Sequence, residues 1–182
     1  YDLPQHVVDV LVDEDPTVVS LMTVTWPVYT VEPPGLRVPL GLVFHGFGAP
    51  LASDYTDWTE HLAAKGMVVV HVAYPSHLIV EGQEEPIVSG GRSNHPQHAL
   101  RMDAMIAAMD VLEGELLLNR DADAQGWLMG AVVDPSALYL GGHSLGAGMA
   151  MMVAAAALDR GWATEALAVD LEQPYTHASD EN

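Results

Sequence analysis

The sequence predicts an α/β protein in which helices flank a mostly parallel sheet. Short apolar runs, typical of buried strands, alternate with helical patterns through most of the chain. Two β-branched segments, residues 6–12 and 17–26, precede this alternation and predict an antiparallel start. Residues 142–146 (Gly-His-Ser-Leu-Gly) separate a strand-like run from an Ala- and Met-rich helical pattern. In such a protein, ligands bind at the carboxyl ends of the parallel strands.

After the antiparallel start, each element is predicted from its pattern and its flanking residues. Ser53 or Asp54 can cap a helix, Gly66 can end it, and Pro96 suits the first turn of the next helix. The predicted elements are a strand at 39–44, a helix from 53 or 54 to 65, a strand at 67–73, a helix at 96–117, a strand at 137–140, a helix to 158 and a strand at 166–169. Residues 74–94 and 119–135 are predicted to be long connections, which are commonly functional.

The composition excludes several classes of function. Twenty-five acidic residues against six basic ones give 182 residues a formal charge of −19. Nucleic acid is therefore not an expected partner, and an anionic membrane surface is disfavoured, because phosphate binding needs Lys and Arg. No apolar run approaches the ~20 residues of a membrane-spanning helix. An acidic surface with Lys65 as the single lysine suits a high-salt environment, although an ordinary acidic protein explains it equally well.

No metal or cofactor is predicted. The absence of cysteine excludes disulfides, thiolate metal sites and a cysteine nucleophile. Residues 121–126 resemble the start of a calcium loop, but Val132 stands where the closing Glu belongs, which favours an acidic surface loop. His95 and His98 lack a third ligand and are better explained as residues flanking a helix start. Neither a compartment nor an oligomeric state is indicated.

Ser144 is the candidate reactive residue. A serine on a strained strand-to-helix turn exposes its hydroxyl, and the crowded backbone there favours glycine at positions 142 and 146. The free N–H groups of the following helix would point at the same place, where an oxyanion could be held. The alternative is a simple strand-to-helix loop that uses glycine for its turn. Residues 45–48 (His-Gly-Phe-Gly) end another predicted strand, so both motifs are expected at one edge of the sheet.

Together these motifs resemble those of the α/β-hydrolase superfamily. Residues 142–146 look like its nucleophile elbow, residues 45–48 look like its His-Gly oxyanion loop, and the order of elements is similar over nearly the whole chain. Residues 26–27 and 62–70 most resemble the esterase branch that contains dienelactone hydrolases, chlorophyllases and platelet-activating-factor acetylhydrolases. The resemblance implies an α/β-hydrolase fold and a serine esterase or lipase that acts on small-molecule esters without a cofactor.

The resemblance also implies roles for individual residues. Ser144 would be the nucleophile that forms an acyl-enzyme. The backbone N–H groups of Phe47 and Leu145 would form the oxyanion hole. His45 would support the loop rather than accept the proton, and His143 would pack behind the elbow. A non-catalytic hydrolase-fold module that binds a ligand or partner is the alternative function.

The chain departs from the family pattern at its end. In the family, the triad acid follows the seventh or the sixth strand and the histidine follows the eighth. Six strand-like segments are visible here, so residues 1–182 are expected to be a single but incomplete α/β-hydrolase-type domain that lacks its C-terminal strands. Asp170 and His177 are the remaining candidates for acid and base, although a polar terminal stub is the favoured interpretation of that segment.

Overall fold

The computed structural model describes residues 5–11, 21–27, 36–47, 49, 51–74, 77–80, 83–86, 95–117 and 132–172. Within these ranges, the central sheet consists of β1 (Gln5–Leu11), β2 (Leu21–Pro27), β3 (Arg37–Phe44), β4 (Val68–Ala73), β7 (Val132–His143) and β8 (Ala166–Glu172). The helical elements are η1 (Ala52–Tyr55, a 3₁₀ turn), α1 (Thr56–Ala64), α2 (His95–Val111), η2 (Leu112–Leu117, a π-helical continuation of α2) and α3 (Leu145–Asp159).

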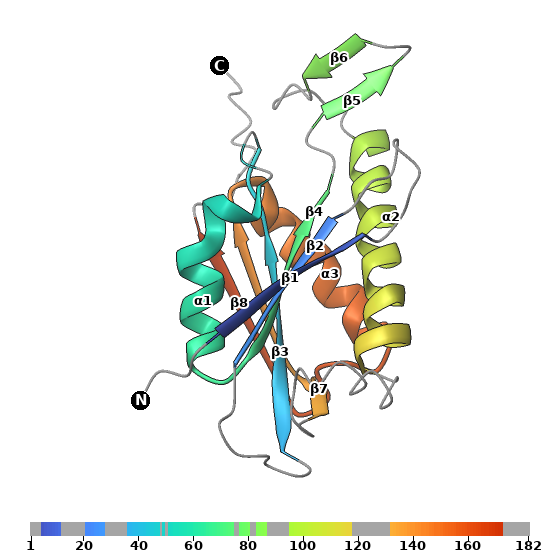
Figure 1. Ribbon diagram of the computed structural model, residues 1–182. Helices are drawn as coiled ribbons and strands as arrows, with labels where there is room; N and C mark the ends of the chain where they lie inside the picture. The colour runs from blue at the N-terminus through green and yellow to red at the C-terminus, as the bar shows by residue number, and fades with distance from the viewer. Residues whose placement is uncertain are drawn as a thin grey trace.

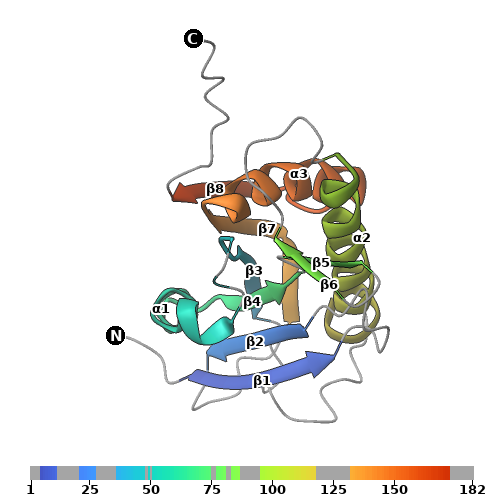
Figure 2. The same ribbon diagram turned by 90° about the horizontal axis from the view of Figure 1, so that it is seen from above.

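The sheet has the order β1-β2-β4-β3-β7-β8 (Figures 1 and 2). The pairs β1–β2 and β2–β4 are antiparallel, whereas β4–β3, β3–β7 and β7–β8 are parallel. The predicted class, an α/β protein with an antiparallel start and a mostly parallel sheet, is therefore confirmed. Because β3 and β7 are parallel neighbours, with Phe44 opposite Gly142, the segments that follow them emerge side by side.

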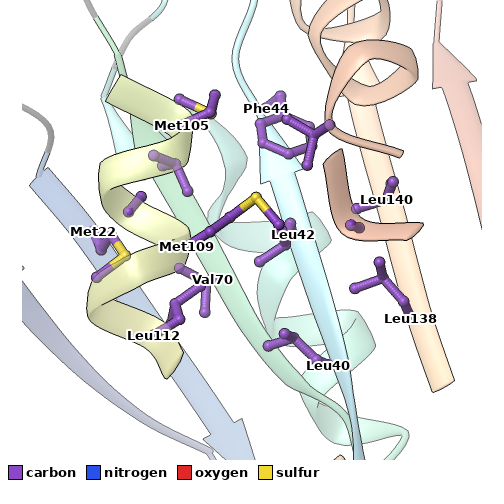
Figure 3. Packing of buried hydrophobic residues seen from close by; sticks show 14 of the residues in the cluster. Met22, Leu40, Leu42, Phe44, Val70, Met105, Met109, Leu112, Leu138 and Leu140 are labelled. Atoms are coloured by element: carbon purple, nitrogen blue, oxygen red, sulfur yellow. The ribbon is translucent and has the colours of Figure 1, made fainter. Parts of the chain in front are cut away.

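Helices cover both faces of the sheet. Figure 2 shows α1 on one side, with α2 and α3 on the other. The larger core lies on the α2–α3 side, where Met105, Met109 and Leu112 pack toward Leu40 and Leu42 of β3 (Figure 3). Neighbouring strand residues point to opposite faces, so Val43 and Val69 instead join Tyr55 and Ala63 in a smaller cluster under α1.

Strand β7 is longer than the sequence predicts. Residues up to 135 were expected to belong to a connection, but the strand already begins at Val132. The polar stretch 134–136 interrupts the apolar pattern, which is why the strand signal is lost there. Asp134 has two polar partners: it accepts the Ser136 N–H at 3.1 Å and pairs with Arg37 of the neighbouring strand β3 at 2.7 Å.

Two further local predictions need correction. Neither Ser53 nor Asp54 caps the helix, because the 3₁₀ turn η1 comes first and neither η1 nor α1 has a side-chain cap. Gly66 does end the α1 region, with a left-handed φ of 92° that favours glycine. The predicted connection 74–94 contains a hairpin, β5 (His77–Val80) with β6 (Gln83–Pro86), which extends beyond the sheet in Figure 1. Strands of four residues are too short to give a clear alternation.

Strand β8 forms one edge of the described sheet. It pairs with β7, and most of its side chains are exposed, including the apolar Leu167 and Val169. An open strand of this kind presents unpaired backbone groups and apolar side chains to another segment or chain. In the part of the chain that the structure describes, no helix has both the length and the apolar character to cross a membrane.

Candidate active site

Ser144 lies at a strained turn between β7 and α3. Its backbone angles, φ 53° and ψ −112°, lie outside the regions that L-residues normally occupy. Such a conformation costs about 1–3 kcal/mol and persists where the surroundings enforce it. Two hydrogen bonds do so here: the Ser144 N–H donates to the Glu172 carbonyl at 2.8 Å, and the Ser144 carbonyl accepts the Ala147 N–H at 3.1 Å. The turn is thus held between the end of β8 and the start of α3.

Close backbone contacts explain the two glycines that flank the serine. A Cβ atom on Gly142 would collide with the main chain of Gly146, and one on Gly146 would collide with the carbonyls of Phe44 and His45. Backbone atoms cannot rotate away as a flexible side chain can. The Gly-x-Ser-x-Gly spacing is therefore a steric requirement for seating α3 against the end of β3.

The loop after β3 reaches the elbow, as the sequence predicts. A Cβ on Gly46 would lie 2.7 Å from Nδ1 of His143, the residue that precedes the serine. Phe47 follows at the surface with 42% of its area exposed. The structure therefore brings Phe47, Leu145 and Ser144 to one edge of the sheet, where the carboxyl ends of β3 and β7 meet. Their assignment as oxyanion donors and nucleophile remains a prediction.

His45 is engaged with the loop itself. Its fully buried ring stacks on Tyr74 with centroids 3.8 Å apart, and the Tyr74 hydroxyl donates to the His45 carbonyl. Nδ1 lies 2.9 Å from the Gly46 carbonyl, and the Tyr74 N–H reaches Nε2 at 3.1 Å. Nε2 also lies 2.9 Å from the Tyr74 carbonyl, so both ring nitrogens are engaged with backbone groups. Burial lowers the His45 pKa, which keeps the ring neutral.

Tyr55, at the junction of η1 and α1, is a site residue that sequence reasoning missed. Its hydroxyl accepts the Gly46 N–H at 2.6 Å and lies 3.5 Å from Nδ1 of His143. Burial raises the pKa of the phenol, so the hydroxyl keeps its proton. From the sequence alone, a tyrosine at the start of a helix is expected to be an ordinary core residue, and no local pattern distinguishes it as a site residue.

Of the two remaining triad candidates, Asp170 and His177, only Asp170 lies in the described ranges. The Asp170 carboxylate accepts a hydrogen bond from the Tyr139 hydroxyl at 3.1 Å, and that hydroxyl accepts the Trp58 indole N–H at 3.2 Å. Burial raises the pKa of Tyr139 to about 12, so it stays a donor to the carboxylate. His177 lies outside the described residues, as do residues 121–126, the possible calcium loop. No three His, Asp or Glu side chains in the described ranges are grouped to hold a metal.

An open cavity of about 360 Å³ adjoins the elbow on the α1 side of the sheet. Aromatic and acidic side chains from η1, α1 and the ends of β7 and β8 line it together with Ala49, which precedes η1. The lining residues are Ala49, Asp54, Tyr55, Asp57, Trp58, His143 and Glu172. Phe47 is not among these lining residues. Parts of the predicted connections 74–94 and 119–135 lie outside the described residues.

The strand order, the flanking helices and the strained serine turn define an α/β-hydrolase fold. No protein-family model and no curated protein sequence matches the chain. Solved structures do. A bacterial heroin esterase aligns with a TM-score of 0.53 at 24% identity, over 93% of this chain and 44% of its own. An esterase from the archaeon Pyrobaculum calidifontis aligns with a TM-score of 0.55 at 23% identity, over 88% of this chain and 43% of the esterase. Brefeldin A esterase, a bacterial homologue of human hormone-sensitive lipase, aligns with a TM-score of 0.52 at 22% identity. The alignment covers 99% of this chain and 43% of that esterase.

At these identities the likeness establishes the fold. The chain spans less than half the length of each of these esterases.

Proposed function

We propose that this chain carries the nucleophile and the oxyanion hole of a serine hydrolase that acts on carboxylic esters. The observation that carries the proposal is the backbone of Ser144, which is held in a strained conformation directly beside the loop after β3. A protein that needed only a turn at this place would have no reason to put a serine, rather than glycine, at a positive φ. The esterase activity of the similar structures supports the same class of reaction.

The proposed reaction follows from the positions of these groups. The Ser144 Oγ attacks the ester carbonyl carbon while a base takes its proton, and the carbonyl oxygen becomes an oxyanion. The N–H groups of Phe47 and Leu145 donate to that oxyanion. Collapse breaks the bond to the alcohol oxygen, which leaves with the proton, and an acyl ester remains on Ser144. Water then attacks the acyl carbon and releases the acid. The base is unassigned, and Asp170 with His177 is one arrangement to test.

The narrower family assignment also belongs to this proposal. Residues 26–27 and 62–70 favour the branch of dienelactone hydrolases, chlorophyllases and platelet-activating-factor acetylhydrolases, whereas the similar solved structures include a homologue of hormone-sensitive lipase. Both groups hydrolyse esters, so the reaction class does not depend on the choice. A substrate panel that contains lactones, short acyl esters and long acyl esters separates the two.

Ester hydrolysis by the full-length protein and its Ser144→Ala variant tests the proposal. The substitution removes the nucleophile but keeps the turn, so we expect about a 10⁴-fold or greater loss of hydrolysis with the fold intact, as in other triads. Unchanged circular dichroism and thermal stability are the control. Undiminished turnover by the variant would remove Ser144 from the mechanism.

A non-catalytic binding module is the second candidate, and one observation favours it. In the described ranges, no histidine is hydrogen-bonded to the Ser144 hydroxyl: His45 serves the loop, and His143 faces Tyr55. Without a base, a serine hydroxyl is a poor nucleophile at neutral pH. Fluorophosphonate labelling of residues 1–182, beside their His177→Ala variant, decides the point. We expect slow labelling of both; rapid labelling that His177→Ala abolishes would show a complete triad in this segment.

A further inference from the structure

We propose that the Tyr55 hydroxyl is a positioning group that holds the oxyanion loop against the nucleophile elbow. This inference rests on the proposed function. The hydroxyl lies between the two motifs: it accepts the Gly46 N–H at 2.6 Å, and its oxygen lies 3.5 Å from Nδ1 of His143. Gly46 belongs to the loop after β3, and His143 precedes the serine. A single side-chain oxygen thus bridges two segments almost a hundred residues apart in sequence.

The bridge also bears on the orientation of the predicted oxyanion donor. The Gly46 N–H donates to Tyr55, and the predicted donor is the next N–H along the loop, that of Phe47. Its direction is set by the Gly46–Phe47 peptide plane. The described chain has no cis peptide, and in a trans peptide the N–H points opposite to the preceding carbonyl. That carbonyl lies 2.9 Å from Nδ1 of His45. Tyr55 and His45 therefore hold Gly46 from both sides and orient the Phe47 N–H.

Tyr55 is itself rigidly placed. It is 7% exposed, and its ring stacks on His71 with centroids 5.3 Å apart. It also joins Val43, Ala63 and Val69 in the cluster under α1. The position of its hydroxyl is therefore fixed by the packing of α1 on the sheet. An electrostatic site works best when its donors need no rearrangement during the reaction, and this packing meets that condition.

The test is Tyr55→Phe in the full-length protein, which removes the oxygen and keeps the ring. Loss of an oxyanion donor typically costs about 10²–10³-fold in kcat, and a misaligned donor costs less. We expect kcat to fall about 10–100-fold while KM changes little, because the contact matters most when the oxyanion forms. We also expect the NMR signal of the Gly46 amide proton to move upfield and to exchange faster with solvent.

Thr59→Val is the matched control. Thr59 lies on α1, is 5% exposed, and its hydroxyl donates to the Thr56 carbonyl of the same helix at 3.1 Å. The Thr59→Val variant loses one side-chain hydrogen bond, so its stability should fall about as much as that of Tyr55→Phe, while its kcat stays unchanged.

An unchanged Gly46 amide signal in Tyr55→Phe would overturn the bridge. A shifted signal with unchanged kcat, or an equal loss of kcat in Thr59→Val, would overturn the positioning role. Absence of ester hydrolysis in the parent protein would instead overturn the proposed function and, with it, any catalytic role for Tyr55. The amide signal would still report the hydrogen bond in that case, so the two failures are distinguishable.

Discussion

The α-carbon of Gly146 lies so close to the main-chain carbonyl of Phe44 that no side chain fits between them. Phe44 ends β3, and Gly146 lies in the first turn of α3. Their contact joins the two motifs, because the loop that begins at His45 leaves β3 directly above the turn that carries Ser144. The geometry of the candidate site thus depends on the absence of one methyl group.

Gly146→Ala should therefore disrupt the site and the fold together. The added Cβ meets backbone atoms that cannot move aside, so we expect a loss of about 3 kcal/mol or more in the free energy of unfolding. Denaturant titration measures it. Gly148→Ala is the matched control, because Gly148 lies two residues further along α3 and a methyl group added there would meet no atom within 4 Å. There we expect a gain of about 0.5–1 kcal/mol from helix propensity. Equal changes in stability for Gly146→Ala and Gly148→Ala would contradict the close contact of Gly146 with Phe44.

His71 should make the protein acid-sensitive. Its ring is 1% exposed, neither ring nitrogen has a hydrogen-bond partner among the described residues, and burial lowers its pKa to about 3. The unfolded chain binds a proton near pH 6.5, whereas the folded chain does not until about pH 3. Stability from this group is therefore present above pH 6.5 and is lost as the pH falls toward 3, by at most about 1.4 kcal/mol per pH unit.

The variant His71→Leu removes this proton uptake. We expect its stability relative to the parent to rise steadily as the pH is lowered from 6.5 to 4, measured by urea titration at each pH. Parallel profiles for His71→Leu and the parent would show that His71 is solvated or protonated in the folded state.

Phe47→Ala should change substrate preference more than stability. The side chain is 42% exposed beside the elbow, and the N–H that serves the proposed oxyanion hole survives the substitution. Loss of an apolar wall is worth about 1–3 kcal/mol between acyl chains that differ in length. Relative kcat/KM for a series of acyl esters measures it. Leu51→Ala truncates another exposed apolar side chain nearby and should leave the series unchanged. An unaltered preference in Phe47→Ala would place the acyl pocket elsewhere.

Salt should stabilise the protein if its acidic excess is an adaptation. A formal charge of −19 produces repulsion that ions screen, so Tm should rise between low and molar NaCl. Sodium sulfate at the same ionic strength separates two effects of salt. Charge screening depends on the ionic strength, whereas exclusion of the salt from the protein surface depends on which ion is present. A flat or falling Tm in NaCl would leave the charge without a stabilising role.

Local patterns in the sequence predict the main elements of the sheet and the serine turn. Strands such as β3 and β4 are continuous apolar runs because both of their faces are covered, and this gives a strong signal. The start of β7 and the hairpin β5–β6 were missed, since polar residues stabilised by partners distant in the chain, or very short strands, leave no periodic pattern.

What the sequence by itself determined is that residues 142–146 form a strand-to-helix turn, because the glycine spacing and the change from a strand-like to a helical pattern lie within one short segment. Only the tertiary structure decided which groups surround it. Tyr55 reaches Gly46 and His143 because η1 and α1 pack on the sheet at β4 and β2, next to β3, and Asp170 meets Tyr139 because β8 pairs with β7 in one register. Those contacts join distant segments, and hydrogen-bond distance between them is set by the packing of whole elements rather than by any local pattern.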